Sequence, residues 1–242
     1  MKLEIPKLHF IIPCYNPDEG WEYIIVEKYL ELKNRLTSAE IGFVIVNDGS
    51  TYGVDKGIID FLNSRISNLQ LIQCKRNHGK GYALRKGVEA LKGDYFIYTD
   101  IDFPYTIESI ITIYNRLIEG ADVVIGIREP SYYKKVPMRR AIISKGVKKL
   151  IKYLLKTDIT DTQCGLKGFN EKGKQVFLRT TINRFLFDMQ FVQIASHEPS
   201  LNLKLQTVYT REGVLFSHMN AKVLLGESFN FLKLIFLPKK GK

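Results

Sequence analysis

The segment Tyr95-Phe-Ile-Tyr-Thr-Asp-Ile-Asp102 joins a short apolar run to two carboxylates. The run 95–99 predicts a buried β-strand, and Asp100 and Asp102 close it at positions i and i+2. Two carboxylates held so close together repel each other, and a divalent cation removes that repulsion. Mg²⁺ and Mn²⁺ prefer oxygen ligands and are commonly held by one or two carboxylates together with substrate phosphates. The segment therefore predicts a metal-diphosphate site at Asp100 and Asp102, although acidic pairs also occur in ordinary turns.

Apolar runs and helical patterns alternate on both sides of this segment. Such alternation is typical of an α/β fold with a Rossmann-like, mostly parallel sheet flanked by helices. Predicted strands cover residues 8–13, 41–46, 69–74, 95–99, 121–127 and 201–209, and predicted helices cover 20–36, 54–66, 81–91, 107–118, 137–156 and 185–195.

Polar residues follow the predicted strands of the first half. They are Tyr15-Asn16, Asn47-Asp-Gly-Ser50, Asn77-His-Gly-Lys80, Asp100-Ile-Asp102 and Arg128. Ligands of parallel sheets bind at the carboxyl ends of the strands. We therefore expect these residues to meet at one edge of the sheet and to form the functional site there.

Two of these turns suggest a specific chemistry. In Asn77-His-Gly-Lys-Gly81, the glycines and the start of the following helix would let the backbone approach a phosphate, and Lys80 would add a point charge. In Asn47-Asp-Gly-Ser-Thr51, Asp48 would accept a hydrogen bond from the base or the ribose of a nucleotide. An ordinary strand-to-helix turn and an Asx turn are the respective alternatives.

Composition limits the class of protein. The chain has 242 residues, of which 45% are hydrophobic, so it can bury a substantial core. Its three cysteines and four histidines show neither a disulfide framework nor the spacing of zinc ligands. No segment approaches the roughly 20 apolar residues that span a bilayer, and no signal peptide is evident. We expect a cytoplasmic protein.

The net charge of +11 is unevenly distributed. Residues 130–157 contain nine Lys or Arg residues and no acid, and they include the predicted helix 137–156 with its apolar stripe. A basic amphipathic helix can lie in the interface of an anionic membrane, so we expect peripheral attachment to the cytoplasmic membrane face. Packing of the stripe on the sheet is the alternative, and residues 221–242 are a second candidate for interfacial contact.

The order of these motifs resembles family 2 glycosyltransferases of the GT-A fold. The similarity rests on Ile12-Pro-Cys-Tyr-Asn16, Asn47–Thr51, Asn77–Gly81, Asp100–Asp102, Gly126-Ile-Arg128 and Asp161-Thr-Gln-Cys-Gly-Leu-Lys-Gly-Phe169. It covers roughly residues 8–220. The chain looks most like the dolichyl-phosphate glucosyl- and mannosyltransferase branch and its bacterial polyprenyl-phosphate relatives. Pro17, Asn47 and Gln190 depart from that family's usual Glu, Asp and Glu, which leaves the choice of donor open.

The resemblance implies one glycosyltransferase domain over residues 1–242. Residues 1–128 would bind the nucleotide sugar, 129–220 would form the acceptor half, and 221–242 would be an interfacial tail. It also implies a role for each matched position. Pro13, Tyr15, Asn16, Asp48, Lys80 and Asp100 would bind the nucleotide sugar, Asp100 and Asp102 would hold Mg²⁺ or Mn²⁺, Arg128, Arg140 and Ser144 would face the acceptor phosphate, and Asp161, Gln163 and Asp188 would be catalytic.

The implied function is metal-dependent, inverting transfer of a hexose from a nucleotide sugar to a polyprenyl or dolichyl phosphate. UDP-glucose is favoured over GDP-mannose as the donor. One alternative is transfer to a saccharide hydroxyl in capsule or cell-wall synthesis, for which Asp188 would be the general base. Another is a non-enzymatic nucleic-acid-binding protein. We expect no nucleic-acid partner, because the basic residues lack interleaved aromatic side chains.

Overall fold

The computed structural model describes residues 5–129, 159, 161–184 and 186–212. The predicted basic helix 137–156, the tail 221–242, and the predicted acceptor residues Arg140 and Ser144 lie outside these ranges. Within the described part of the chain, no helix is long and apolar enough to cross a bilayer.

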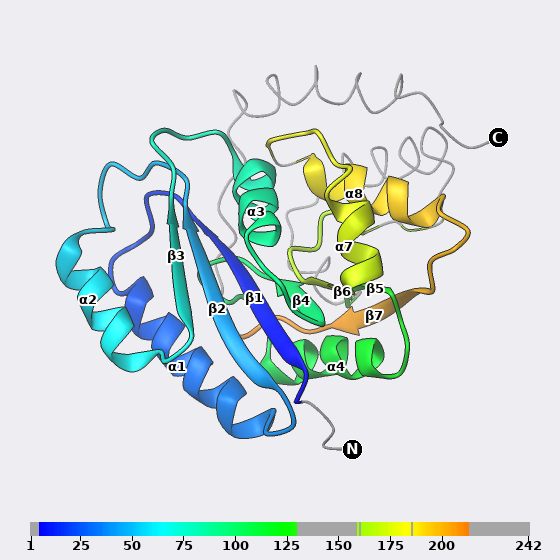
Figure 1. The fold of residues 1–242 in the computed structure, drawn as a ribbon, viewed down its shortest axis with the longest axis horizontal. Helices are drawn as coiled ribbons and strands as arrows, with labels where there is room; N and C mark the ends of the chain where they lie inside the picture. The colour runs from blue at the N-terminus through cyan, green and yellow to red at the C-terminus, as the bar shows by residue number, and fades with distance from the viewer. Residues whose placement is uncertain (1–4, 130–158, 160, 185, 213–242) are drawn as a thin grey trace.

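A seven-stranded sheet forms the centre of the molecule, with the strand order β3-β2-β1-β4-β6-β5-β7 (Figure 1). All pairs are parallel except those made by β6, which runs antiparallel to both of its neighbours. This arrangement confirms the predicted mostly parallel α/β sheet. The strands are β1 (Lys7–Cys14), β2 (Glu40–Asn47), β3 (Leu69–Gln73), β4 (Tyr95–Tyr98), β5 (Val123–Arg128), β6 (Lys167–Asn170) and β7 (Leu203–Val208).

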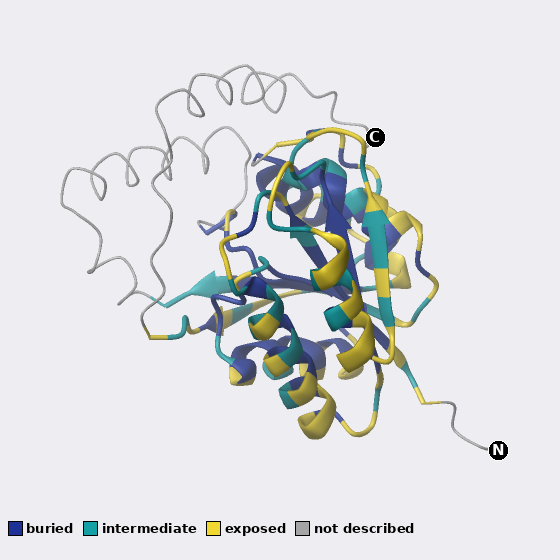
Figure 2. Cartoon of the chain, turned by 90° about the vertical axis from the view of Figure 1, so that its left-hand side faces the viewer, coloured by how far each residue is buried: buried dark blue, intermediate teal, exposed yellow. Residues whose placement is uncertain are grey.

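Helices cover both faces of the sheet. One apolar cluster joins the sheet to α1, α2 and α4, and a second joins its other face to α3, α7 and α8. Figure 2 shows buried residues lining the strands and exposed residues on the outer helix surfaces. The helices are α1 (Trp21–Arg35), α2 (Lys56–Arg65), α3 (Lys80–Glu89), α4 (Ile107–Ile118), α7 (Glu171–Phe177) and α8 (Phe187–Ser196).

The sequence did not predict β6 or α7. The segment Lys167-Gly-Phe-Asn170 is short and contains a charge, a glycine and a turn-forming residue, so it has no strand pattern. It becomes a strand because it fills the gap between β4 and β5, where Phe169 packs fully buried against Phe96 and Phe177. The side chain of Asn170 then caps α7 by accepting from the amide of Gly173 at 3.0 Å.

Candidate active site

The loops that follow β1 and β2 are bonded to each other at the carboxyl edge of the sheet. The amide of Asn16 donates to Ser50 Oγ at 2.9 Å, and Asn16 Oδ1 accepts from the amide of Thr51 at 2.8 Å. Asn16 adopts a positive φ of 46°, which asparagine tolerates better than most residues. Pro13 is half-buried and Tyr15 is 50% exposed beside this junction. Asn16 thus holds the two loops together and leaves Tyr15 accessible.

Asp100 and Asp102 follow β4 as predicted, and Lys80 from the start of α3 lies beside them. Lys80 Nζ is 2.5 Å from Asp100 Oδ1. Burial alone would lower the pKa of Lys80, but the charges of Asp100 and Asp188 outweigh it and the pKa is raised. Lys80 therefore stays charged at neutral pH.

The two aspartates fit the oxygen donor set of Mg²⁺ or Mn²⁺. The pKa of Asp102 is raised by burial first and then by the charge of Asp100. The negative charge of Asp100 thus disfavours the ionised form of Asp102, and Lys80 is ion-paired with Asp100. Both carboxylates remain accessible, with 37% of the Asp100 side chain exposed. A divalent cation would relieve the remaining repulsion.

Gly165 is a part of this site that residue-type reasoning missed. A Cβ atom at this position would lie 2.4 Å from Asp100 Oδ2 and 3.5 Å from Lys80 Nζ. Its amide donates to the buried hydroxyl of Tyr105 at 2.9 Å. The absent side chain makes room for the carboxylate of Asp100, so the segment 161–165 approaches this aspartate through its backbone. The only sequence signal was its place in Asp161-Thr-Gln-Cys-Gly165.

Asp48 is buried and holds the loop before α3. Its carboxylate accepts from the amide of His78 at 3.0 Å and from the amide of Gly79 at 2.7 Å. Gly49 permits this close approach, since a Cβ there would lie 2.4 Å from the backbone of Arg76. The structure therefore gives Asp48 a definite task in fixing the loop 76–79.

The predicted phosphate cradle at residues 77–81 has several of its backbone amides bonded within the protein. The amide of Gly79 is taken by Asp48, and the amides of Gly81 and Tyr82 donate to the carbonyl of Asn183 at 2.7 and 3.2 Å. A Cβ on Gly79 would lie 2.5 Å from the carbonyl oxygen of Asn183. The glycines thus make room for another stretch of protein backbone, and these hydrogen bonds leave fewer amides at the start of α3 for an anion.

Arg128 and Asp161 form a buried pair at the end of β5. Arg128 donates from Nε to Asp161 Oδ2 at 2.9 Å and from Nη2 to Oδ1 at 2.5 Å, and its backbone amide adds a third bond. Burial alone would raise the pKa of Asp161, but the hydrogen bonds and charge of Arg128 lower it. Gln163, two residues further on, is exposed. The pair ties the start of the segment 161–165 to the sheet.

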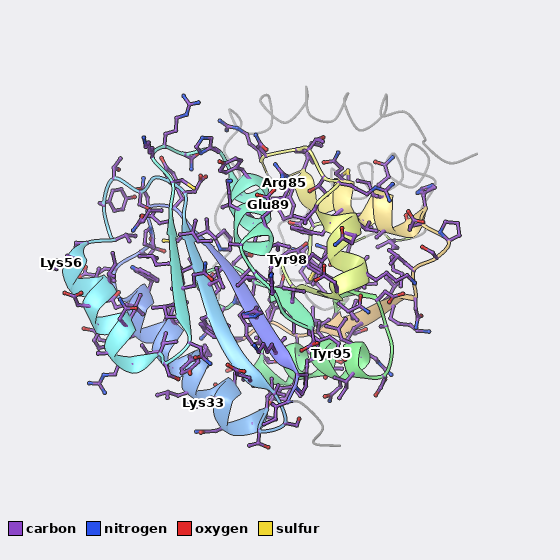
Figure 3. All side chains as sticks on the ribbon, in the orientation of Figure 1. Lys33, Lys56, Arg85, Glu89, Tyr95 and Tyr98 are labelled. Atoms are coloured by element: carbon purple, nitrogen blue, oxygen red, sulfur yellow. The ribbon has the colours of Figure 1, made fainter. Side chains whose placement is uncertain are left out.

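Asp188 lies at the start of α8 in a buried ion pair. Its Oδ1 accepts from Lys167 Nζ at 2.5 Å and from the hydroxyl of Tyr98 at 2.6 Å, and Lys167 has no exposed side-chain surface. Tyr98, labelled in Figure 3, belongs to β4 and donates to this pair through its hydroxyl. Lys167 also donates to the carbonyl of Cys164. The ion pair thus links β4, β6 and α8 behind the aspartate pair.

Arg211 fixes the turn that carries Asp102. It donates from Nη2 to the carbonyl of Asp102 at 2.6 Å and from Nε to the carbonyl of Phe103 at 2.7 Å. Phe103 has a positive φ of 43°, so these bonds hold the turn in an uncommon conformation. An arginine beyond the last strand carries no local signal for this contact, and the sequence did not predict it.

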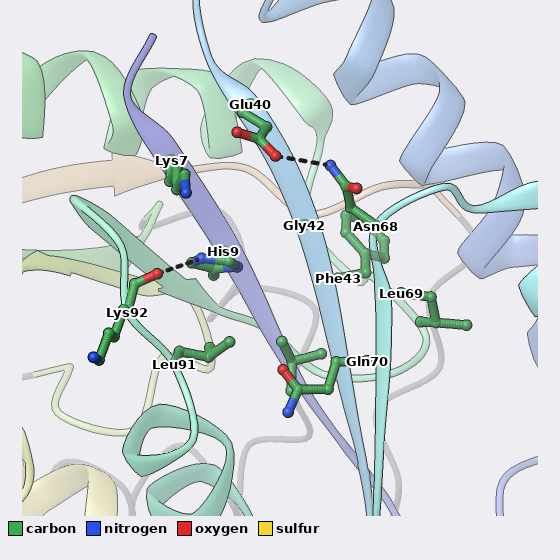
Figure 4. A pocket seen from close by; sticks show the side chains of 11 residues that line it. Lys7, His9, Glu40, Gly42, Phe43, Asn68, Leu69, Gln70, Leu91 and Lys92 are labelled. Atoms are coloured by element: carbon green, nitrogen blue, oxygen red, sulfur yellow. Dashed lines mark hydrogen bonds between the residues drawn. The ribbon is translucent and has the colours of Figure 1, made fainter. Parts of the chain in front are cut away.

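A hollow at the opposite edge of the sheet contains none of these residues (Figure 4). It lies where β1, β2 and β3 begin, and His9 occupies its wall. The ring stacks on Phe96 and donates from Nε2 to the carbonyl of Lys92 at 3.1 Å, while burial lowers its pKa. Gly42 and Gly93 leave space for this ring, so the features here serve packing.

The family model for glycosyl transferase family 2 matches residues 9–176 of the chain. The match covers the aspartate pair, the Asp48 loop and the segment 161–165. The chain is a family 2 glycosyltransferase. Membership of an enzyme family counts against the non-enzymatic nucleic-acid-binding alternative.

The glycosyltransferase is similar to curated dolichyl-phosphate beta-glucosyltransferases. It is 26% identical to the Dictyostelium discoideum protein over 202 residues, which is 78% of this chain and 62% of that protein. A Trichomonas vaginalis protein of the same description, ALG5D, is 29% identical over 200 residues, which is 77% of this chain and 60% of that protein. The chain therefore spans about three fifths of the length of these relatives.

Solved structures confirm the GT-A fold. Mannosyl-3-phosphoglycerate synthase from Rubrobacter xylanophilus superimposes with a TM-score of 0.70 at 12% identity, over 95% of this chain and 72% of that one. Glucosyl-3-phosphoglycerate synthase from Mycobacterium tuberculosis was solved with Mn²⁺, UDP-glucose and phosphoglyceric acid. It superimposes with a TM-score of 0.65 at 11% identity, over 95% of this chain and 78% of that one.

The buried pair of Lys167 and Asp188 makes a stability prediction. Asp188→Asn leaves a fully buried ammonium without its counter-charge, so we expect the free energy of unfolding to fall by about 3–5 kcal/mol. The double variant Lys167→Met, Asp188→Leu removes both charges and should recover most of that loss. Urea denaturation followed by circular dichroism measures both, with exposed Asp60→Asn as the control. An Asp188→Asn protein as stable as this control would contradict the ion pair.

The Arg128–Asp161 pair makes a prediction about pH. Because the folded-state pKa of Asp161 is lowered, the pair stabilises the protein fully above the ordinary aspartate pKa of about 3.9. This contribution is lost as the pH falls through the lower, folded-state value. The difference in unfolding free energy between wild type and Asp161→Asn should therefore be largest near pH 6 and shrink below about pH 4. Urea titrations across this range measure it, and a constant difference would contradict the assignment.

Proposed function

We propose that this glycosyltransferase moves a hexose, preferably glucose, from UDP-glucose to a polyprenyl phosphate with inversion at the anomeric carbon. The observation that carries the proposal is the convergence of Asp100, Asp102 and Lys80 at the carboxyl edge of the sheet. Two carboxylates and a lysine suit a metal-bound diphosphate. The names of the curated relatives support the lipid acceptor, and the Mycobacterium neighbour, with its Mn²⁺ and UDP-glucose, supports the donor.

In this proposal Asp100 and Asp102 hold Mg²⁺ or Mn²⁺, which supplies positive charge to the departing diphosphate. Lys80 adds a fixed cation on the same side, and it exchanges its contact with Asp100 for a phosphate oxygen. Gly165 keeps the segment 161–165 close enough for exposed Gln163 to reach the sugar. Pro13, Tyr15, Asn16 and Asp48 bound the nucleotide end, where Asp48 acts by holding the loop 76–79.

The bonds of Asp188 favour a phosphate acceptor over a hydroxyl acceptor. A hydroxyl needs a carboxylate base, whereas a lipid phosphate is already ionised near pH 7. Asp188 is 4% exposed and already accepts from Lys167 and Tyr98, so its role here is to position β6 and α8. Asp188→Asn would report lost stability as well as any base function, so the acceptor is better identified from the product.

The two bonds from Arg128 to Asp161 refine the acceptor side of the proposal. These bonds engage Nε and Nη2 of the guanidinium. We assign Arg128 the task of fixing the segment 161–165 against the acceptor. Arg140 and Ser144 remain predictions for the phosphate contact, and the basic residues 130–157 remain a prediction for an anionic membrane surface.

A transfer assay tests this function. The protein is incubated with radiolabelled UDP-glucose or GDP-mannose, Mn²⁺ and polyprenyl phosphate in detergent micelles. We expect label from UDP-glucose in the organic extract, bound through a mild-acid-labile glycosyl phosphate. Asp102→Asn should lower kcat/KM on the order of 100-fold or more, because transition-state charge loses its counter-ion, whereas Asp60→Asn should not.

Other products would contradict parts of this function. Label that stays in a water-soluble saccharide would establish a hydroxyl acceptor. Transfer of label from GDP-mannose and not from UDP-glucose would contradict the proposed choice of UDP-glucose as the donor. Full activity in EDTA, or in Asp102→Asn, would overturn the metal site.

A further inference from the structure

Three potential metal ligands of different types meet beside the Asp48 loop. Asp48 follows β2, Cys74 follows β3, and His78 precedes α3. Their ligand atoms all lie within 4.8 Å of one another, and they are the one such group of three among the described residues. The separation of 26 and 30 residues from Asp48 hides this cluster from any spacing rule in the sequence.

We propose that Asp48, Cys74 and His78 form a site for a thiophilic divalent cation such as Zn²⁺, distinct from the aspartate pair that takes Mg²⁺ or Mn²⁺. Imidazole, thiolate and carboxylate are all zinc ligands, and three protein ligands leave one position open. The aspartate pair offers oxygen alone and so has no preference for such an ion.

The distances suit a tetrahedral ion. Bonds of about 2.0–2.3 Å place tetrahedral ligand atoms roughly 3.3–3.8 Å apart. His78 Nδ1 is 3.4 Å from Asp48 Oδ1, which is within that range. The thiol of Cys74, half-buried after β3, lies within 4.8 Å of both of these ligand atoms, so the three atoms would have to draw together by about 1 Å or less around an ion.

Two of the three ligands are already held in place by other groups. The carboxylate of Asp48 is fixed by the amides of His78 and Gly79, and its Oδ1, which accepts from the amide of His78 at 3.1 Å, also lies 3.4 Å from the imidazole Nδ1. The ring of His78 stacks on Tyr82 at 4.2 Å between centroids. Outer contacts of this kind orient metal ligands and raise affinity.

Binding releases one proton per ion. The thiol of Cys74 loses its proton to solvent and becomes a thiolate. The ion takes the place of the proton between His78 Nδ1 and Asp48 Oδ1, and that proton moves to Nε2 of the ring. Exposed Arg76 now donates from Nε to His78 Nε2 at 3.5 Å, so it turns away when Nε2 becomes protonated. Because the thiol must lose its proton before it binds the ion, binding should tighten as the pH rises.

The occupied site should also compete with the donor. This consequence rests on the proposed function, in which Asp48 and its loop bound the nucleotide end. An ion on these three residues would project its open position toward the nucleotide. Zn²⁺ would then inhibit the enzyme, whereas Mg²⁺ or Mn²⁺ at the other site would activate it.

Co²⁺, a spectroscopic substitute for Zn²⁺, tests the site. Titration of the protein should give a thiolate-to-cobalt charge-transfer absorption that saturates at one ion per chain and is bleached by Zn²⁺. Cys74→Ser should abolish the absorption, and His78→Ala should weaken binding more than about 100-fold, beyond the usual effect of losing an outer contact. Cys14→Ser and His197→Ala, which change a cysteine and a histidine outside the cluster, should leave it unchanged.

Different results would contradict the cation site and its competition with the nucleotide. An absent absorption, or one that survives Cys74→Ser, would overturn the site itself. An absorption that persists at saturating UDP would overturn only the competition, and with it the proposed place of the nucleotide. Loss of the absorption on adding UDP would support both.

Discussion

The repulsion between Asp100 and Asp102 is the constraint on which the rest of the site depends. Both follow β4, and Lys80 is ion-paired with Asp100. Three other segments contact the aspartate pair or its turn. Gly165 has no side chain that would clash with Asp100, Arg211 donates a hydrogen bond to the carbonyl of Asp102, and α3 supplies Lys80. Stability alone would favour replacing one of the carboxylates, because nearby like charges cost free energy. Their joint presence supports the proposed cation site.

Most of the fold could be predicted because parallel strands have strong local patterns. The runs at β1, β2 and β4 are nearly continuous in apolar residues, and each is followed by polar residues that the topology brings to one edge. β6 could not be predicted, because Lys167 looks like a surface residue. Its burial depends on Asp188, which is 21 residues away in the sequence. The same limit applies to Gly165 and Arg211, whose roles follow from contacts between distant segments.

The glycines before α3 show why a motif needs its surroundings. Residues 77–81 have the composition of a phosphate-binding turn, but the amides of His78 and Gly79 donate to Asp48 and that of Gly81 donates to the carbonyl of Asn183. Departures from the family pattern are also matched by their neighbours. The side-chain amide of Asn47 donates to Gln73 at 2.7 Å, which a carboxylate could not do, and Gln190 Oε1 accepts from the amides of Thr181 and Ile182. These substitutions therefore fit a folded, intact site.

The central claim is that the aspartate pair binds a nucleoside diphosphate through a metal ion. The most direct measurement is the melting temperature with UDP, UDP-glucose, GDP or GDP-mannose, each in Mn²⁺ and in EDTA. A ligand of the native state at 100 times its Kd adds about 2.7 kcal/mol of stability. The account predicts a clear rise for UDP and UDP-glucose in Mn²⁺ and none in EDTA. An equal rise in EDTA, or no rise with any nucleotide at millimolar concentration, would contradict it.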